Sequence, residues 1–101
     1  MSELELIIND DLKLEKVAYV LKTIGHPVRL KIISLLSSYK QLTVNELCEK
    51  CEVEQSLISH HLNNMKLKGI LKSYRDGKNI YYSIALDEVL HVIECMSKCS
   101  L

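Results

Sequence analysis

The sequence predicts a mainly α-helical domain with one small β-hairpin, in the order helix, helix, helix, helix, strand, strand, helix. Apolar residues recur at helical spacing over most of the chain, and an Asp-Gly pair separates two short alternating segments. No stretch has the composition of a linker, a repeat or a low-complexity segment. A chain of 101 residues is long enough for one core and too short for two. We therefore expect one domain over residues 1–101, with residues 1–10 loosely attached.

The composition restricts both the core and the cellular compartment. The chain has five tyrosines but no Trp or Phe, so its core must consist of aliphatic side chains and tyrosine. A domain of this size buries only about two thirds of its unfolded surface, and a dimer would bury more. No apolar stretch approaches the roughly 18 residues of a membrane span, and no signal-like leader opens the chain. We expect a cytoplasmic protein with reduced cysteines and no membrane partner.

The first two helices are predicted from apolar spacing and from their end signals. From Asp11 onward one apolar face recurs at spacings of three and four and ends at Gly25. This face consists of Leu14, Val17, Ala18, Leu21 and Ile24. Pro27 suits the first turn of the second helix, and His26 before it is assigned a structural role. Arg29 is expected either to hold this helix or to contact a phosphate. The buried face of the second helix consists of Leu30, Ile32, Ile33, Leu35 and Leu36.

The third and fourth helices meet at a tight corner. Thr43 and Glu46 form a capping box for a short helix that ends near Lys50. The fourth helix covers roughly residues 54–68, and Gly69 ends it. Its inner face is expected to carry Ile58, Leu62 and Met65. Its outer face is expected to carry Gln55, Ser56, Ser59, His60 and Asn63.

A hairpin and a last helix complete the order of elements. Residues 70–74 and 79–84 alternate large apolar side chains, and the Asp76-Gly77 pair between them favours a type I′ turn. Asp87 is expected to cap a last helix with an apolar stripe of Val89, Leu90, Ile93 and Met96. A helix pair followed by such a hairpin is a winged helix-turn-helix.

The distribution of charge favours a polyanionic partner although the net charge is zero. Residues 1–16 carry five acidic and two basic side chains, whereas residues 60–80 carry five basic and one acidic. The basic part coincides with the fourth helix and the hairpin, as a DNA-facing surface would. The alternative is an ordinary solvated face.

The polar residues that open the fourth helix are suited to base edges in the major groove. Gln55 can bond adenine in bidentate fashion, and the hydroxyl and imidazole groups that follow can donate or accept. Basic residues at the hairpin tip would lie against the phosphate backbone or the minor groove. The alternative is a set of ordinary exposed polar side chains. We predict that the DNA-binding residues are Gln55, Ser56, Ser59, His60, Asn63, Arg75 and Lys78.

Four segments carry a family resemblance: LKTIGHPVRLKIISLL, TVNEL, QSLISHHL and the hairpin GILKSYRDGKNIYYSI. Together they resemble the ArsR/SmtB family of bacterial metalloregulators over residues from about 15 to 99. The resemblance implies a homodimeric repressor, joined through its first and last helices, that binds a DNA operator and leaves it when an inducer binds. In such a dimer the fourth helix of each subunit would be the recognition helix. The two recognition helices should bind inverted half-sites about 10 base pairs apart, or a multiple of that.

The corner and the third helix depart from the family pattern. Glu52 stands where a Gly is usual and is expected to need a positive φ, and Glu54 stands where a capping Ser is usual. Thr43 and Asn45 occupy the positions of the family's Cys-x-Cys site for soft metals or arsenite. Cys48 matches a third cysteine of some arsenic-responsive members. Cys48 and Cys51 are interpreted first as small buried hydrophobes, with a thiolate pair as the alternative.

The last helix carries a second set of sulfur and nitrogen groups. His91, Cys95 and Cys99 are spaced by four, so they lie on nearly one face and could bind a soft metal or metalloid ion completed by a second subunit. Thiol oxidation and simple packing are the alternatives. The family's zinc site is matched only in pieces, and Ser34 stands where redox-responsive relatives have a second cysteine.

Other function classes remain for comparison. A winged helix can bind DNA constitutively without an inducer, or can serve as a protein-interaction adaptor. An enzyme is not expected, because the sequence has no Gly-rich phosphate loop and no paired carboxylates, and it is too short to enclose a substrate.

Overall fold

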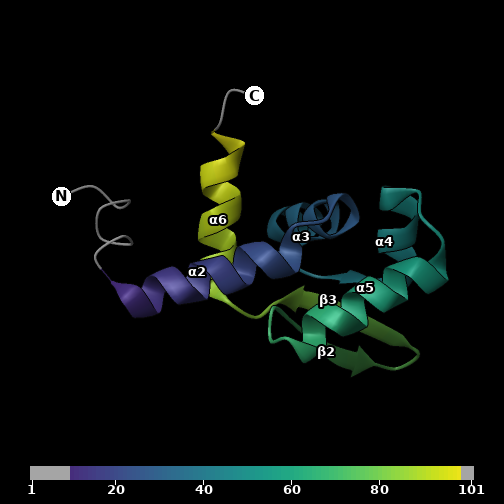
Figure 1. Ribbon diagram of the computed structural model, residues 1–101. Coiled ribbons are helices and arrows are strands. Elements are labelled where there is room, and N and C mark those ends of the chain that lie inside the picture. The colour runs from purple at the N-terminus through teal and green to yellow at the C-terminus, as the bar shows by residue number, and fades with distance from the viewer. Residues whose placement is uncertain (1–9, 99–101) are drawn as a thin grey trace.

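The computed structural model describes residues 10–98, and the order of its elements confirms the predicted fold class (Figure 1). The predicted loose attachment of residues 1–10 falls outside the described residues, except for Asp10. The elements are α2 (Asp11–Ile24), α3 (Pro27–Tyr39), β1 (Leu42–Thr43), α4 (Val44–Cys51), α5 (Gln55–Leu67), β2 (Leu71–Asp76), β3 (Asn79–Ile84) and α6 (Asp87–Ser97).

Side-chain caps fix the beginnings of the helices. The Val28 N–H donates to His26 Nδ1 at 3.1 Å, which confirms the structural role predicted for His26. The Glu46 N–H donates to the Thr43 hydroxyl at 3.2 Å, and Glu46 accepts from the Thr43 N–H at 3.0 Å, so the predicted capping box is present. The expected cap by Asp87 is wrong. Asp87 is the first residue of α6, where its charge still favours the positive end of the helix.

The sheet contains one strand more than predicted. β1 pairs with β3, and β3 pairs with β2, all antiparallel. β1 has only two residues, Leu42 opposite Tyr82 and Thr43 opposite Tyr81, and two residues are too few to show an alternating pattern. This strand fastens the start of α4 to the hairpin.

The core lies where α3, α4, α5 and the sheet meet. Within the described part of the chain, the predicted inner face of α5 is fully buried at Ile58, Leu62 and Met65. These side chains meet Ile32, Ile33, Leu36, Leu47 and Ile70 in one apolar cluster. α5 is therefore held by its inner face, and its opposite face is left to solvent. None of the described helices combines the length and apolarity that crossing a bilayer requires.

The predicted apolar face of α2 is largely outside this core. Ile24 is buried and Val17 half-buried, but Leu14, Ala18 and Leu21 are exposed. Figure 1 shows the first turns of α2 reaching past the rest of the molecule, and α2 packs on α3 and α6.

The apolar stripe of α6 is similarly open. Val89 is buried, Leu90 and Ile93 are half-buried and Met96 is 45% exposed. The ammonium group of Lys16 on α2 pairs with the Glu88 carboxylate at 2.9 Å and ties the two helices together.

Candidate nucleic-acid interface

The outward face of α5 carries the polar residues that the sequence analysis singled out. Gln55, Ser56, His60 and Asn63 are exposed, and Ser59 is half-buried. Ser56, His60 and Asn63 follow one another at spacings of four and three, so they share one face of the helix. This face lies opposite the buried side chains of Ile58 and Leu62. The packing of α5 thus presents hydrogen-bonding groups to solvent over its first three turns.

The corner before α5 has the backbone predicted from its sequence. Glu52 adopts φ 56° and ψ 43°, a left-handed conformation that costs a non-glycine residue roughly 1–2 kcal/mol. Its N–H donates to the Cys48 carbonyl oxygen and closes α4. Glu54 occupies the N-cap of α5, where the family usually has a capping Ser, but its side chain makes no capping hydrogen bond. Its carboxylate remains exposed beside the positive end of α5.

The hairpin projects beside α5 as a wing, which we define as β2, β3 and the turn between them. Asp76 lies opposite Asn79, so the turn consists of Gly77 and Lys78. Only Gly77 of these two has a positive φ, of 64°, which is the pattern of a type II′ turn and not of the predicted type I′ turn. Arg75 and Lys78 are both exposed at the tip.

Aromatic packing stiffens the wing. The rings of Tyr74 and Tyr81 stack across the two strands at a centroid distance of 5.3 Å. The Tyr74 hydroxyl donates to the Gln41 side-chain oxygen at 2.8 Å, which fixes the wing to the loop before β1. Arg75 and Lys78 therefore extend from a braced hairpin.

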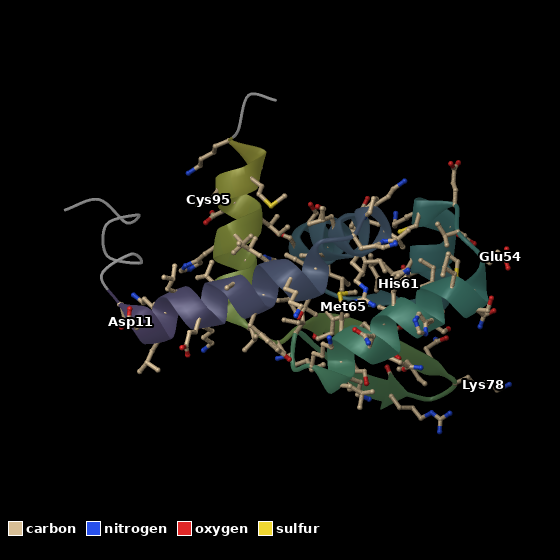
Figure 2. All side chains as sticks on the ribbon, in the orientation of Figure 1. Asp11, Glu54, His61, Met65, Lys78 and Cys95 are labelled. Atoms are coloured by element: carbon tan, nitrogen blue, oxygen red, sulfur yellow. The ribbon has the colours of Figure 1, made fainter. Side chains whose placement is uncertain are left out.

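A groove joins the two parts of this surface. It is lined by Thr43, Val44, Asn45, Gln55, Lys78, Asn79 and Ile80. Gln55 at the start of α5 and Lys78 at the wing tip both border it, although they are 23 residues apart in sequence. Figure 2 shows Glu54 and Lys78 at the same end of the molecule. The structure thus brings together two of the residues that the sequence assigned to DNA.

The comparisons with known proteins agree with this geometry. Residues 26–73 match the family described as bacterial regulatory protein, arsR family. The transcriptional repressor PagR of Bacillus anthracis is 40% identical over 86 residues, which cover 85% of this chain and 86% of PagR. The chain belongs to the ArsR family. Its sequence resemblance to that family is thereby confirmed.

Further comparisons add a solved structure and a regulator named for cadmium resistance. The crystal structure of PagR has a TM-score of 0.76 at 39% identity and covers 86% of this chain and 99% of PagR. The cadmium resistance regulatory protein CadC of Listeria innocua is 33% identical over 73 residues, which cover 72% of this chain and 61% of CadC.

The fold is also that of the homodimeric winged helix-turn-helix domain of Mb0332 from Mycobacterium bovis. Its TM-score is 0.72 at 24% identity, with 96% of this chain and 84% of that chain covered. This ArsR-family chain is therefore a winged helix-turn-helix, DNA-binding transcriptional regulator.

A partly buried polar cluster beneath α5 was not predicted as a set from the sequence. Arg29 on α3 donates from Nε to His61 Nδ1 at 2.9 Å and from Nη1 to Asn64 Oδ1 at 2.9 Å. Arg29 also donates to the Thr23 carbonyl oxygen at 3.0 Å. Of the two roles expected for Arg29, the structure shows the first, because its guanidinium holds α3 against α2 and α5. A sequence signal existed in the polar residues of the inner face of α5, at His61 and Asn64.

The cysteines of α4 have the environment of packed thiols. Cys51 is buried and Cys48 half-buried at the end of α4. Burial raises the pKa of both thiols, and the charge of Lys31 opposes this only in part at Cys51. A raised pKa keeps a thiol protonated, which disfavours metal ligation and nucleophilic reaction. Their interpretation as small apolar side chains therefore fits this environment better than the thiolate pair does.

The residues of α6 that were predicted to sense an inducer lie apart from the cysteines of α4. His91 and Cys95 are exposed one helical turn apart, and Figure 2 shows Cys95 far from α4. Cys99 lies outside the described residues. Within residues 10–98, no group of three or more His, Cys, Asp or Glu side chains is arranged to hold a metal ion.

Proposed function

We propose that this chain is a homodimeric transcriptional repressor that binds a palindromic operator in cytoplasmic double-stranded DNA. The observation that carries the proposal is the placement of the polar face of α5 and the basic wing tip at one end of the same subunit. We take residues 1–101 as one winged-helix domain. The repressor activity named for PagR supports the proposed direction of regulation.

In the proposed complex α5 contacts the base edges and the wing contacts the phosphate backbone. The outward face of α5 places Ser56, His60 and Asn63 toward the floor of the major groove, which is wide enough to admit a helix. Gln55 lies at the leading end, where residues of a reading helix reach base edges. Ser59 is half-buried and borders this face, so it serves bases or phosphates at the edge of the contact.

The wing supplies positive charge, which the polar residues on the outward face of α5 lack. Arg75 and Lys78 are exposed, and within residues 10–98 neither forms an ion pair. Lys78 borders the groove that leads to Gln55, so a strand lying across this groove would contact the wing and α5 together. Cationic side chains at such a place set the register of the protein through phosphate contacts.

The open apolar faces of α2 and α6 support a second copy as the partner. Leu14 and Leu21 on α2 are 45% and 46% exposed, and Met96 on α6 is 45% exposed. Such side chains gain roughly 25 cal/mol for each Å² that a partner covers. A two-fold dimer through these helices carries two copies of α5, which would address inverted half-sites about 10 base pairs apart or a multiple of that. Mb0332, which shares this fold, is described as homodimeric.

We propose release by a thiol-reactive or soft-metal inducer that acts on α6. His91 and Cys95 are accessible on α6, a helix that forms part of the proposed dimer interface. Metal ligation or thiol oxidation there would therefore change how the two subunits are positioned relative to each other. Cys99, four residues after Cys95 in the sequence, would add a third group. The name of CadC, a cadmium resistance regulator, supports a soft-metal ligand. A constitutive repressor without an inducer is the alternative.

The experiment that tests DNA binding is a comparison of the unmodified chain with the double variant Ser59→Ala, His60→Ala. The duplex is one that the unmodified chain selects from a random-sequence library. We expect the double variant to lose binding by fluorescence anisotropy and to remain a dimer in analytical ultracentrifugation. Undiminished binding would contradict the assignment of α5.

Salt separates a repressor from a protein-interaction adaptor. The log of the affinity of a DNA-binding dimer should fall linearly with the log of salt concentration, whereas an adaptor should not bind duplex at low salt.

A further inference from the structure

His61 is a buried titratable residue that does not contact DNA in the proposed complex. It is 5% exposed and lies on the face of α5 turned toward α3, away from the outward polar residues (Figure 2). Its Nδ1 accepts the hydrogen bond from Arg29 Nε at 2.9 Å. The neutral ring therefore carries its proton on Nε2. Among residues 10–98 this buried Nε2 has no hydrogen-bond partner.

Arg29 on α3 joins three helices, because its other hydrogen bonds reach α5 and α2. Its Nη1 donates to Asn64 Oδ1 on α5 and to the Thr23 carbonyl oxygen on α2, at 2.9 and 3.0 Å. His61 and Asn64 are one turn apart on α5, so a single guanidinium binds that helix at two points. The same guanidinium also connects α5 to the end of α2. The rotation of α5 about its own axis is thus fixed from beneath.

The charged and titratable groups around His61 all disfavour a second positive charge. Arg29 is a permanent cation, the His26 ring lies 4.7 Å from the His61 ring and the His60 ring lies 5.7 Å away. No carboxylate of the described residues is among the groups that shift the pKa of His61. Burial first, and then Arg29, His26 and His60, lower this pKa.

We propose that His61 is a positioning residue of α5 that holds this helix in its DNA-binding position only while its ring is neutral. The inference rests on the proposed function and concerns the regulation of the same surface. Protonation would add a solvent proton to Nδ1, so that two donors and two cations would face each other across 2.9 Å. Arg29 would have to move, and its bonds to Asn64 and Thr23 would be lost with it.

The sign of the pH effect follows from the lowered pKa. The ordinary pKa of histidine is about 6.5, and that of His61 lies below it in the folded protein. The folded state therefore takes up this proton less readily than the unfolded state. As the pH falls from about 6.5 through the folded-state pKa, His61 becomes protonated and α5 leaves its DNA-binding position. General electrostatics has the opposite sign, because added positive charge strengthens the attraction of a protein to DNA.

The test compares the unmodified chain with His61→Asn, which removes the titrating ring, and with His26→Asn, which removes one of its cationic neighbours. In His61→Asn the new side-chain oxygen can still accept from Arg29 at the place of Nδ1 but does not titrate. In His26→Asn the new amide side chain still caps α3, but a group that lowers the pKa of His61 is removed, so the loss of affinity should begin at a higher pH. Binding to a duplex selected at pH 8 is measured by anisotropy from pH 8 to pH 5.5 at constant ionic strength. We expect the unmodified chain and His26→Asn to lose severalfold more affinity than His61→Asn as the pH falls, with the loss in His26→Asn beginning at the higher pH.

Equal pH dependence of all three proteins would overturn the inference while leaving the proposed function intact. If His61→Asn does not fold, ¹⁵N NMR of the His61 ring in the complex of the unmodified chain decides instead. The bound form should carry its proton on Nε2 alone, and release of DNA should accompany protonation. A protonated ring in the complex would overturn the inference. Failure of the unmodified chain to bind any duplex at pH 8 would contradict the proposed function, and this inference with it.

Discussion

The contribution of the wing to DNA binding can be predicted from the two exposed cations at its tip. We consider the double variant Arg75→Met, Lys78→Met, which removes both charges and retains unbranched side chains. Neither residue is buried, so the fold of the subunit should be unchanged. The turn itself depends on the positive φ of Gly77, which the variant keeps.

The magnitude follows from counterion release. Each phosphate that a protein neutralises contributes about −0.9 to the slope of log affinity against log salt concentration. Two cations in each subunit make four in a dimer, so we expect the slope to become shallower by about 3.6. Affinity at low salt should fall strongly, whereas preference among duplex sequences should change little, because phosphate contacts carry no direct sequence information.

The assay is a set of anisotropy titrations from about 50 to 200 mM salt with a selected duplex and with a scrambled one. The matched control is Lys13→Met with Lys98→Met, which removes the same charge from α2 and from the end of α6. The control should keep the slope of the unmodified chain to within about one unit. An unchanged slope in the wing variant would refute the assignment of Arg75 and Lys78 to the phosphate backbone.

Four further predictions concern the stability and regulation of the fold. Leu62→Ala should lower the free energy of unfolding by about 2–5 kcal/mol in urea titrations, because it opens a cavity under α5. Glu52→Gly should raise it by up to about 1 kcal/mol, since glycine adopts the left-handed conformation of the corner without strain. The double variant Cys95→Ser, Cys99→Ser should blunt DNA release in titrations with arsenite, Cd²⁺, Zn²⁺, Cu⁺, persulfide and peroxide. Glu88→Gln should be less stable than the unmodified chain near pH 7, because the hydrogen bond from its lysine partner lowers the pKa of Glu88. That difference should vanish as the pH falls from about 4.3 through the lowered pKa, where the unmodified carboxylate is protonated too.

Each of these predictions has an outcome that contradicts it. A Leu62→Ala loss under about 1 kcal/mol would mean that α5 is not held by its inner face. A less stable Glu52→Gly would mean that the corner is not strained. Full release of DNA from the cysteine double variant would remove these thiols from the response. A Glu88→Gln difference that does not shrink as the pH falls below about 4.3 would show that the ion pair between α2 and α6 is not its source.

The features predicted correctly from sequence depend on neighbouring residues. The positive φ of Glu52 was expected because it stands where the ArsR/SmtB family usually has a Gly. The capping box of Thr43 and Glu46 and the buried side of α5 follow from spacings of three or four along the chain. The wing was predicted for the same reason, although its turn lies one residue further on than expected.

The features missed by the sequence analysis depend on residues distant in sequence. Arg29 and His61 are 32 residues apart, so no local pattern reveals that one donates to the other. β1 exists because Leu42 meets Tyr82 across the fold. The predicted face of α2 has the expected helical spacing, but Leu14 on it is 45% exposed within residues 10–98. Periodicity predicts which side of a helix is apolar and does not predict which molecule covers it.

The central claim is that α5 and the wing together form the DNA-binding surface, and NMR mapping tests it most directly. Backbone amide shifts of the full chain are recorded while a selected duplex is added. We expect the largest changes in residues 55–63 and 75–78, with small ones on the solvent side of α6. Changes confined to α6, or absent from α5 at saturating duplex, would contradict the claim.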